Sequence, residues 1–251
     1  MIVIEGAVNT ELDALEARLG PVREVALGGG WHARICSAAE DGVALVNTGV
    51  GVANAAAATA LACAQLNPRA LISQGTAGAH DIALHSGDLV IGRRIVRLGA
   101  YKSAQVAQGV HPLSWQPLSP SGSAGGAVEL ASDERMLELA LQAVAERGFN
   151  VPGAPRAIPG TVGSGDVWNC ERDMIEYLNR TFGTACEEME TYAAAQVCAR
   201  FGVRFLSVRA ISNNERLGET YDPATARAAQ LISGDVALKL MSAASWCGTA
   251  G

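Results

Sequence analysis

Segments typical of β-strands alternate with segments typical of α-helices along most of the chain, and this order constrains the fold more than any other feature. An Ala-rich segment at 51–66 predicts a helix, and it lies between expected strands at 43–47 and 70–73. The same order recurs with a helix at 190–201 and a strand at 204–211. Because a crossover helix usually returns the chain parallel to the preceding strand, the alternation predicts an α/β protein with a mainly parallel sheet.

The remaining segments extend this pattern. We expect further strands at 1–7, 23–27, 31–36, 88–92 and 156–162, and further helices at 172–180 and 223–242. Thr10 is expected to cap a first helix that ends at Gly20, and Ser132 to cap a helix that runs to Gly148. Residues 100–127 contain three prolines and a Gly/Ser-rich run, which predict a long loop. The 251 residues are interpreted as one domain, 1–251, with a divergent loop at about 100–130.

Composition excludes several classes of protein. Hydrophobic residues make up 49% of the chain and charged residues 18%, which indicates a large buried core. A net charge of −6 disfavours a nucleic-acid partner, and no apolar run reaches the roughly 18 residues of a membrane span. The N-terminus lacks the basic region of a secretory signal, and the six cysteines form no C-x-x-C pair. These features predict a cytoplasmic protein with reduced thiols.

Common cofactor and metal motifs are absent from the sequence. There is no phosphate loop, no G-x-S-x-G and no H-E-x-x-H, and the G-x-G at residues 49–51 lacks the third glycine of a dinucleotide fingerprint. His80 and His85, with Asp81 between them, are the best candidates for a metal pair. We interpret them as two loop histidines and expect neither a metal nor a cofactor.

Polar residues follow several expected strands. Glu11 comes after the first strand, Thr76 after the strand at 70–73, and Ser212 and Asn213 after the strand at 204–211. Because ligands in such sheets bind beyond the carboxyl ends of the strands, we expect these side chains to meet at one site.

Several segments together resemble the nucleoside phosphorylase and nucleosidase superfamily, and within it most closely the 5′-methylthioadenosine/S-adenosylhomocysteine nucleosidases. The segments that carry the resemblance are Gly6-Ala7 with Glu11, 48–51, 75–78, 164–166 with Trp168, 187–195 and 209–213. The match spans about residues 1–245, except the 100–130 loop. It implies a three-layer α/β/α fold with a mixed central sheet, a homodimer, and cleavage of the N-glycosidic bond of a purine nucleoside.

The resemblance assigns Glu11 as the carboxylate that activates the attacking water and Glu190 as the group that binds the ribose hydroxyls. A general base suits this reaction, and a carboxylate accepts hydrogen bonds from two adjacent hydroxyls. Met189 is expected to pack under the sugar. Without the resemblance, Glu11 and Glu190 are ordinary acidic residues at helix starts, and Glu187 and Glu188 are taken as solvated or structural.

The same resemblance places Trp168 against the purine, where an indole offers a flat stacking face; the alternative is a half-buried core tryptophan. Val50 and Thr76 lie in the two glycine segments, which let the backbone approach the sugar and the attacking group. Ser212 is assigned to substrate binding, beside Asn213.

The identity of the nucleophile and the presence of catalytic turnover stay open at this point. Arginine is the expected phosphate ligand, and neither 6–10 nor 48–53 contains one, which favours water over phosphate as the nucleophile. A phosphorylase would need arginine from elsewhere, such as Arg93, Arg94 or a neighbouring subunit. A nucleoside-binding protein without turnover is a third alternative.

Asn213 departs from the resemblance, because the methylthioadenosine nucleosidases carry Asp at this position. A carboxamide cannot act as a general acid, but it can donate to N7 and to a 6-carbonyl oxygen. One interpretation is therefore a 6-oxopurine substrate of the inosine or futalosine type. The other is a 6-aminopurine substrate, with Asn214, another loop residue or water supplying the missing contact.

Overall fold

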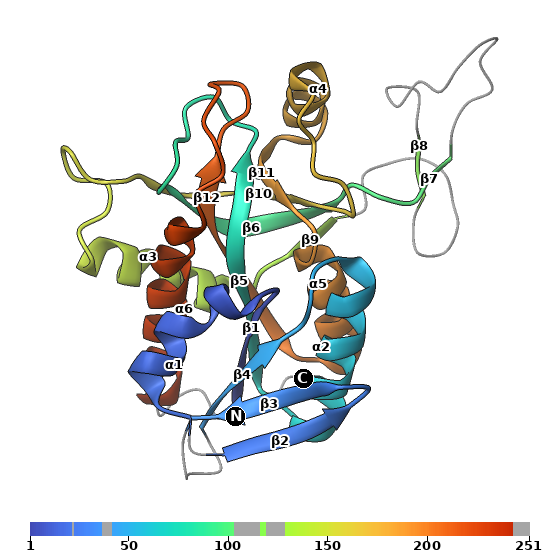
Figure 1. Ribbon diagram of the computed structural model, residues 1–251, viewed down its shortest axis with the longest axis vertical. Coiled ribbons are helices and arrows are strands. Elements are labelled where there is room, and N and C mark those ends of the chain that lie inside the picture. Colours follow the sequence, from blue (N-terminus) through green and yellow to red (C-terminus); the bar gives the residue numbers. More distant parts are fainter. Residues whose placement is uncertain (22, 37–41, 103–115, 119–128, 243–251) are drawn as a thin grey trace.

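The computed structural model describes residues 1–21, 23–36, 42–102, 116–118 and 129–242. One large sheet runs through these residues with the strand order β11-β10-β6-β12-β5-β1-β4-β3-β2 (Figure 1). Its strands are β1 (Ile2–Gly6), β2 (Arg23–Gly28), β3 (Trp31–Ile35), β4 (Val43–Asn47), β5 (Ala70–Ala79), β6 (Leu89–Arg97), β10 (Ala157–Ser164), β11 (Thr184–Glu188) and β12 (Arg204–Asn213). The short strand β9 (Glu129–Ala131) pairs with β6.

The sheet is mixed, as the resemblance implies. Strand β1 is parallel to β4 and β5, and β5 is parallel to β12. Antiparallel pairs join β12 to β6, β11 to β5, and β2, β3 and β4 to one another. The alternation alone predicts a mainly parallel sheet. Among the described strands, parallel pairing is found only at the centre of the sheet and on the side formed by β6, β10 and β11.

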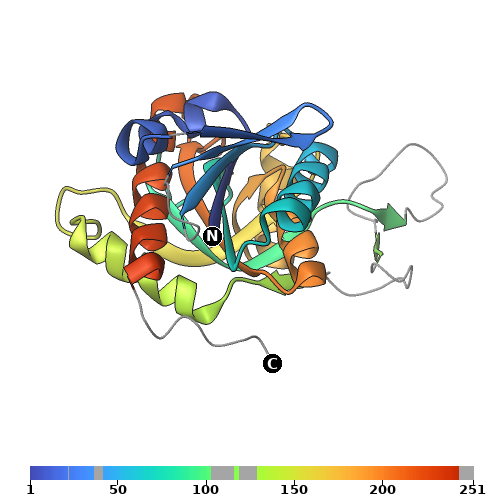
Figure 2. The ribbon, with the colours of Figure 1, turned by 90° about the horizontal axis from the view of Figure 1, so that it is seen from below.

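Helices cover both faces of the sheet, which confirms the three-layer fold. The helices are α1 (Asp13–Leu19), α2 (Val52–Leu66), α3 (Glu134–Glu146), α4 (Arg172–Phe182), α5 (Thr191–Phe201) and α6 (Ala226–Ser242). Figure 2 shows α1, α3 and α6 on one side of the sheet and α2 and α5 on the other. Each side has its own apolar core, centred on Leu15, Met136 and Val236 on the first face and on Ala58, Ala62 and Cys198 on the second.

Several local predictions need correction. The first helix is preceded by a 3-10 turn, Asn9–Glu11, and its N-cap is Leu12 rather than Thr10. The cap of α3 is Asp133 rather than Ser132, because the Asp133 carboxylate accepts the Met136 N–H at 3.0 Å. Gly20 does end α1, with a positive φ of 60°.

The sheet also extends beyond its predicted strands. Residues 75–78, expected to form a glycine loop, belong to β5, and β6 and β12 are both longer than predicted. Strand β11 was not predicted at all. Within the expected long loop the structure places a short pair of strands, β7 (Tyr101–Lys102) and β8 (Gln116–Pro117), while 103–115 and 119–128 lie outside the described residues. Over the described residues, none of the helices has the length and apolar character needed to cross a bilayer.

Candidate active site

A cavity of about 170 Å³ lies at the carboxyl ends of β1, β5, β11 and β12. It gathers every residue that the sequence assigned to the site: Glu11, Val50, Thr76, Trp168, Met189, Glu190, Ser212 and Asn213. The expectation that polar residues at separate strand ends meet at one place is therefore confirmed.

Glu11 is held by the backbone N–H that follows β1 and by a backbone N–H of the neighbouring strand β5. It ends the 3-10 turn between β1 and α1, and it is only 5% exposed. Its Oε2 accepts the Ala7 N–H at 2.8 Å, and its Oε1 accepts the Thr76 N–H at 2.8 Å and the Thr76 hydroxyl at 3.2 Å. The carboxylate is thereby fixed in the cavity wall, where a general base can meet a water molecule.

Position 75 requires glycine, because neighbouring side chains occupy the space that a Cβ atom would need. A Cβ atom there would lie 2.6 Å from Oε1 of Glu11 and 2.8 Å from Nη1 of Arg209. Both distances are far below van der Waals contact. The close approach of β5 to Glu11 therefore depends on this glycine.

Glu190 lies at the start of α5 and points into the same cavity. Its Oε1 accepts the Gly51 N–H at 2.7 Å, which ties it to the loop that follows β4. Burial, followed by the nearby negative charge of Glu188, raises the pKa of Glu190 above its usual range. Its second oxygen remains available to hydroxyl groups of a ligand.

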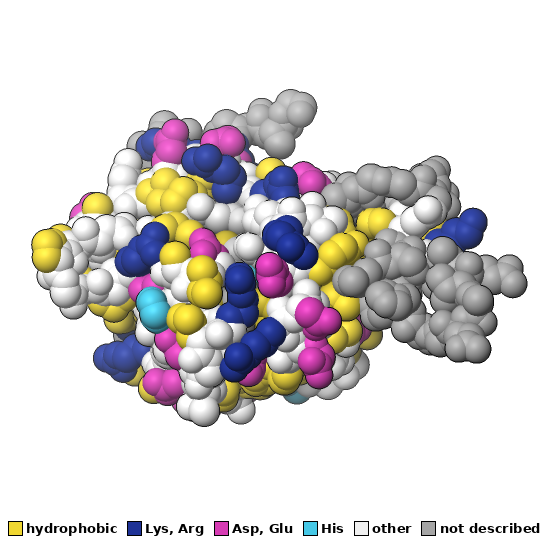
Figure 3. Space-filling model, turned by 90° about the horizontal axis from the view of Figure 1, so that it is seen from above, with side chains coloured by type: hydrophobic (Ala, Val, Ile, Leu, Met, Phe, Trp, Pro, Cys, Tyr) yellow, Lys and Arg dark blue, Asp and Glu magenta, His cyan; other side chains and the backbone are white. Residues whose placement is uncertain are grey.

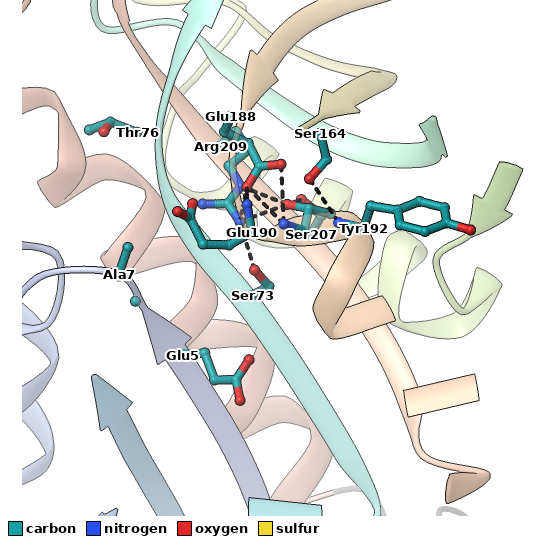
Figure 4. A network of polar contacts seen from close by, with 12 residues as sticks. Glu5, Ala7, Ser73, Thr76, Ser164, Glu188, Glu190, Tyr192, Ser207 and Arg209 are labelled. Carbon is teal, nitrogen blue, oxygen red and sulfur yellow. Dashed lines mark hydrogen bonds and ion pairs between the residues drawn. The ribbon is translucent and has the colours of Figure 1, made fainter. Parts of the chain in front are cut away.

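A buried ion pair behind the cavity positions Glu190 (Figure 4). Nη2 of Arg209 lies 2.9 Å from Oε2 of Glu188 and donates to the hydroxyls of Ser73 and Thr191 at 2.6 Å each. Glu188 in turn accepts the backbone N–H groups of Glu190 and Thr191 at the start of α5. The ion pair thus joins β12, β11 and α5.

Sequence reasoning missed this ion pair. Glu187 and Glu188 are each 7% exposed, and each contacts a buried basic side chain, His80 and Arg209 respectively. The expectation that these glutamates are solvated is therefore wrong, and the alternative that they are structural is correct. The available signal was Arg209 itself, a charge between apolar residues of an expected buried strand, since buried charges are normally paired.

Asn213 lies at the other end of the cavity, where its amide has a fixed orientation. Its Oδ1 accepts the Ser212 hydroxyl at 2.9 Å, and its Nδ2 donates to Oε1 of Glu215 at 3.0 Å. A carboxylate only accepts hydrogen bonds, so Glu215 requires the NH₂ side of the amide to face it. One N–H of that NH₂ group is left for a ligand.

Trp168 borders the mouth of the cavity together with Tyr221. The two rings pack edge to face with their centroids 5.4 Å apart, and they are 55% and 45% exposed. Trp168 is therefore about half buried, as the alternative expects, but it is not part of the apolar core. Tyr221, in the segment between β12 and α6, was not found from the sequence.

The two histidines considered as a metal pair contact different carboxylates. Nε2 of His80 lies 3.1 Å from Oε2 of Glu187 in the interior, whereas Nδ1 of His85 lies 2.7 Å from Oε1 of Glu219 at the surface. Across the part of the chain that the structure describes, no group of three or more His, Cys, Asp or Glu side chains has an arrangement suited to a metal ion.

The surface at this end of the molecule carries mixed charge. Figure 3 views the end at which β12 and α4 lie, and basic and acidic side chains are interspersed over the visible part. That face therefore offers no continuous basic strip of the kind that nucleic-acid backbones require.

The fold and the site define a known class. A sequence profile of the phosphorylase superfamily matches residues 1–237, and the chain belongs to this family. It is 30% identical to the 5′-methylthioadenosine/S-adenosylhomocysteine nucleosidase of Halalkalibacterium halodurans over 221 residues, which is 84% of each chain. The expected enzyme class, an N-glycosyl hydrolase, is confirmed by this kinship.

Solved structures agree with the fold. The 5′-methylthioadenosine/S-adenosylhomocysteine nucleosidase of Neisseria meningitidis, in complex with methylthio-immucillin-A, superposes with a TM-score of 0.77 at 25% identity, covering 95% of this chain and 99% of that one. The futalosine hydrolase of Helicobacter pylori gives 0.71 at 22% identity and covers 96% of both chains, a likeness in fold alone.

Proposed function

We propose that the protein hydrolyses the N-glycosidic bond of a purine nucleoside. The observation that carries this proposal is that Glu11, Glu190 and Asn213 line one cavity, with Glu190 at the start of α5 available to accept ribose hydroxyls. In the reaction, Glu11 takes a proton from water as the water attacks C1′ of an oxocarbenium-like sugar. Asn213 donates a hydrogen bond to the departing base and so stabilises its negative charge.

Water is the nucleophile that the cavity favours. Among the described residues that line it there is no arginine or lysine, although arginine is the usual ligand of phosphate. Of the arginines considered as substitutes, Arg93 does not line the cavity, and Arg94 donates to the carbonyl of Phe182 and lies 3.6 Å from Glu129.

The fixed amide of Asn213 favours a 6-oxopurine such as inosine or futalosine. One N–H of its NH₂ group donates to Glu215, and the other can donate to O6 or N7 of such a base. A 6-aminopurine would present a donor to the same group, and a buried mismatch of this kind costs about 1–3 kcal/mol.

Product analysis tests the reaction. The protein is incubated with methylthioadenosine, adenosylhomocysteine, inosine and futalosine, each with and without phosphate. We expect a free ribose sugar and no dependence on phosphate. Ribose 1-phosphate would indicate a phosphorylase, and tight binding without product would indicate a binding protein.

Glu11→Gln tests the mechanism. The amide keeps the shape of the side chain and removes the base, so we expect turnover to fall about 10²- to 10⁴-fold while nucleoside binding persists. A Glu138→Gln variant serves as the control, because Glu138 is an exposed residue of α3. Near-wild-type turnover in Glu11→Gln would remove Glu11 from the mechanism.

Asn213→Asp tests the choice of base. We expect kcat/KM for 6-aminopurine nucleosides to rise relative to that for 6-oxopurine nucleosides, by about one to two powers of ten. The reason is that an aspartate accepts from the 6-amino group and repels a 6-oxo group unless it is protonated. A uniform fall on both substrates would show that the side chain only holds the loop.

Oligomeric state and location complete the proposal. Kinship with the superfamily supports a homodimer, which light scattering after gel filtration tests directly. A cytoplasmic location is supported by the free thiols of all five described cysteines, and a fluorescent fusion in the source cell would test it.

A further inference from the structure

Glu187 is a buried carboxylate in the cavity wall to which the proposed mechanism gives no role. It is 7% exposed and lies near the end of β11. Its Oε1 accepts the Asn169 N–H at 2.7 Å, its Oε2 accepts the Asn169 side-chain amide at 2.6 Å, and Nε2 of His80 lies 3.1 Å from Oε2. A carboxylate offers about four acceptor positions, so these three contacts leave room for one ligand donor.

Glu187 and Asn213 flank the same residue of the sheet. Gly78 on β5 is paired with Glu187 on one side and with Asn213 on the other. Neighbouring strands lie about 4.8 Å apart, so the α-carbons of the two flanking residues are roughly 10 Å apart. A Cβ at Gly78 would lie 3.7 Å from Oδ1 of Asn213, so this glycine leaves the space beside the Asn213 side chain open.

The position of Gly78 relative to Glu11 fits a nucleoside. Thr76, which binds Glu11, precedes Gly78 by two residues, which is about 6.6 Å along a strand. A nucleoside placed with its attacked sugar carbon near Thr76 would therefore extend the far edge of its base over Gly78, between Asn213 and Glu187.

Glu187 is also coupled to the expected stacking residue. Asn169, which donates two hydrogen bonds to Glu187, directly follows Trp168 at the mouth of the cavity. The Trp168 indole and the Glu187 carboxylate are therefore linked through Asn169. The indole could stack on a face of the base while the carboxylate contacts an edge of the same base.

Building on the proposed function, we propose that Glu187 is a specificity-determining residue that accepts a hydrogen bond from N1–H of a 6-oxopurine. In such a base the acceptor O6 is adjacent to the donor N1–H, and the donor Asn213 and the acceptor Glu187 match this order. In a 6-aminopurine, N1 is itself an acceptor, and a carboxylate opposite it meets a lone pair instead of a proton.

His80 lies against this carboxylate, with its Nε2 3.1 Å from Oε2 of Glu187. Its side chain is 1% exposed, and its Nδ1 lies 2.7 Å from the hydroxyl of Thr184 at the start of β11. The imidazole therefore contacts Thr184 through Nδ1 and faces Glu187 with Nε2.

Calorimetry with free bases tests the proposal without relying on turnover. The wild-type protein is titrated with hypoxanthine, 1-methylhypoxanthine and adenine. We expect hypoxanthine to bind about 10- to 100-fold more tightly than either of the others, because both lack the N1–H donor and adenine adds no bulk at that position. Equal affinities, or tighter binding of adenine, would overturn the role of Glu187.

The same titrations with Glu187→Gln test whether Glu187 causes the preference for hypoxanthine. We expect the preference for hypoxanthine over 1-methylhypoxanthine to fall to less than about threefold, while Glu176→Gln, a change at a 47% exposed side chain of α4, keeps it. A preference that persists in Glu187→Gln would overturn the proposal. The wild-type titrations stand even if this variant does not fold.

The two proposals fail in different ways. If nucleosides are not cleaved but hypoxanthine is selected through N1–H, hydrolysis is wrong and the role of Glu187 holds. If nucleosides are cleaved with no influence of N1 methylation, hydrolysis holds and the role of Glu187 is wrong.

Discussion

The carboxyl group of Glu5 should make the folded protein less stable as the pH rises from 4.5 to 8. Glu5 lies on β1 and is 2% exposed; its Oε2 accepts the Thr59 hydroxyl at 2.9 Å, and its Oε1 has no hydrogen-bond partner among the described residues. Burial raises the pKa of Glu5 from 4.5 to about 8, and the hydrogen bond from Thr59 opposes this only in part.

The sign and size follow from proton linkage. Between pH 4.5 and 8 the folded chain keeps a proton on Glu5 that the unfolded chain has lost, so the free energy of unfolding falls with rising pH. The stabilisation is complete below pH 4.5 and is lost through pH 8. The slope is about 1.4 kcal/mol per pH unit, which sums to about 5 kcal/mol over an interval of about 3.5 units.

Urea denaturation at half-unit pH steps measures this effect. Glu5→Gln keeps the shape and the acceptor for Thr59 but cannot ionise, so its stability should exceed that of the wild type by a margin that grows with pH. The exposed Glu138→Gln variant should follow the wild type at every pH. Parallel curves for wild type and Glu5→Gln between pH 5 and 8 would show that Glu5 ionises normally in the folded state.

Three further outcomes are expected. Arg209→Met leaves Glu188 as an unpaired buried charge, so the free energy of unfolding, measured by urea titration, should fall by about 3–5 kcal/mol. A fall of less than about 1 kcal/mol would refute the role of the ion pair. Gly75→Ala forces a methyl group to within 2.6 Å of Oε1 of Glu11 and should lower kcat about 100-fold in a folded protein; unchanged kcat would mean that the site adapts. Chelation by EDTA should leave activity unchanged, and a loss restored by one divalent ion would contradict the metal-free chemistry.

Much of the framework was predictable, because helices and central strands carry their own hydrophobic patterns. Strand β11 was not, since two of its five residues are glutamates, and its burial depends on His80 and Arg209 from elsewhere in the chain. The second half of β5 was mistaken for a loop because it is rich in glycine. Pairing with β11 and β12 keeps it extended, and tertiary hydrogen bonds of this kind have no local signal.

Many of the residues that line the candidate site were predictable from the sequence, but the residues that support them were not. Every residue assigned through the family resemblance lines the cavity, since strand ends and glycine segments are visible in the sequence. The supporting residues were not, because Glu187, Glu188 and Tyr221 gain their roles only through partners distant in sequence.

Strand β12 contributes both Arg209, which pairs with Glu188 just before the start of α5, and Asn213, the residue proposed to contact the base. Because β12 pairs with β5 along its length as far as Asn213, and with β6 over residues 207–210, the two groups keep a constant separation. In the proposed reaction, an intact nucleoside would behave as a bivalent ligand, in which binding of one half raises the effective concentration of the other. Hydrolysis would cut the link between the halves, so that the proposed reaction would convert one bivalent ligand into two monovalent products that leave separately.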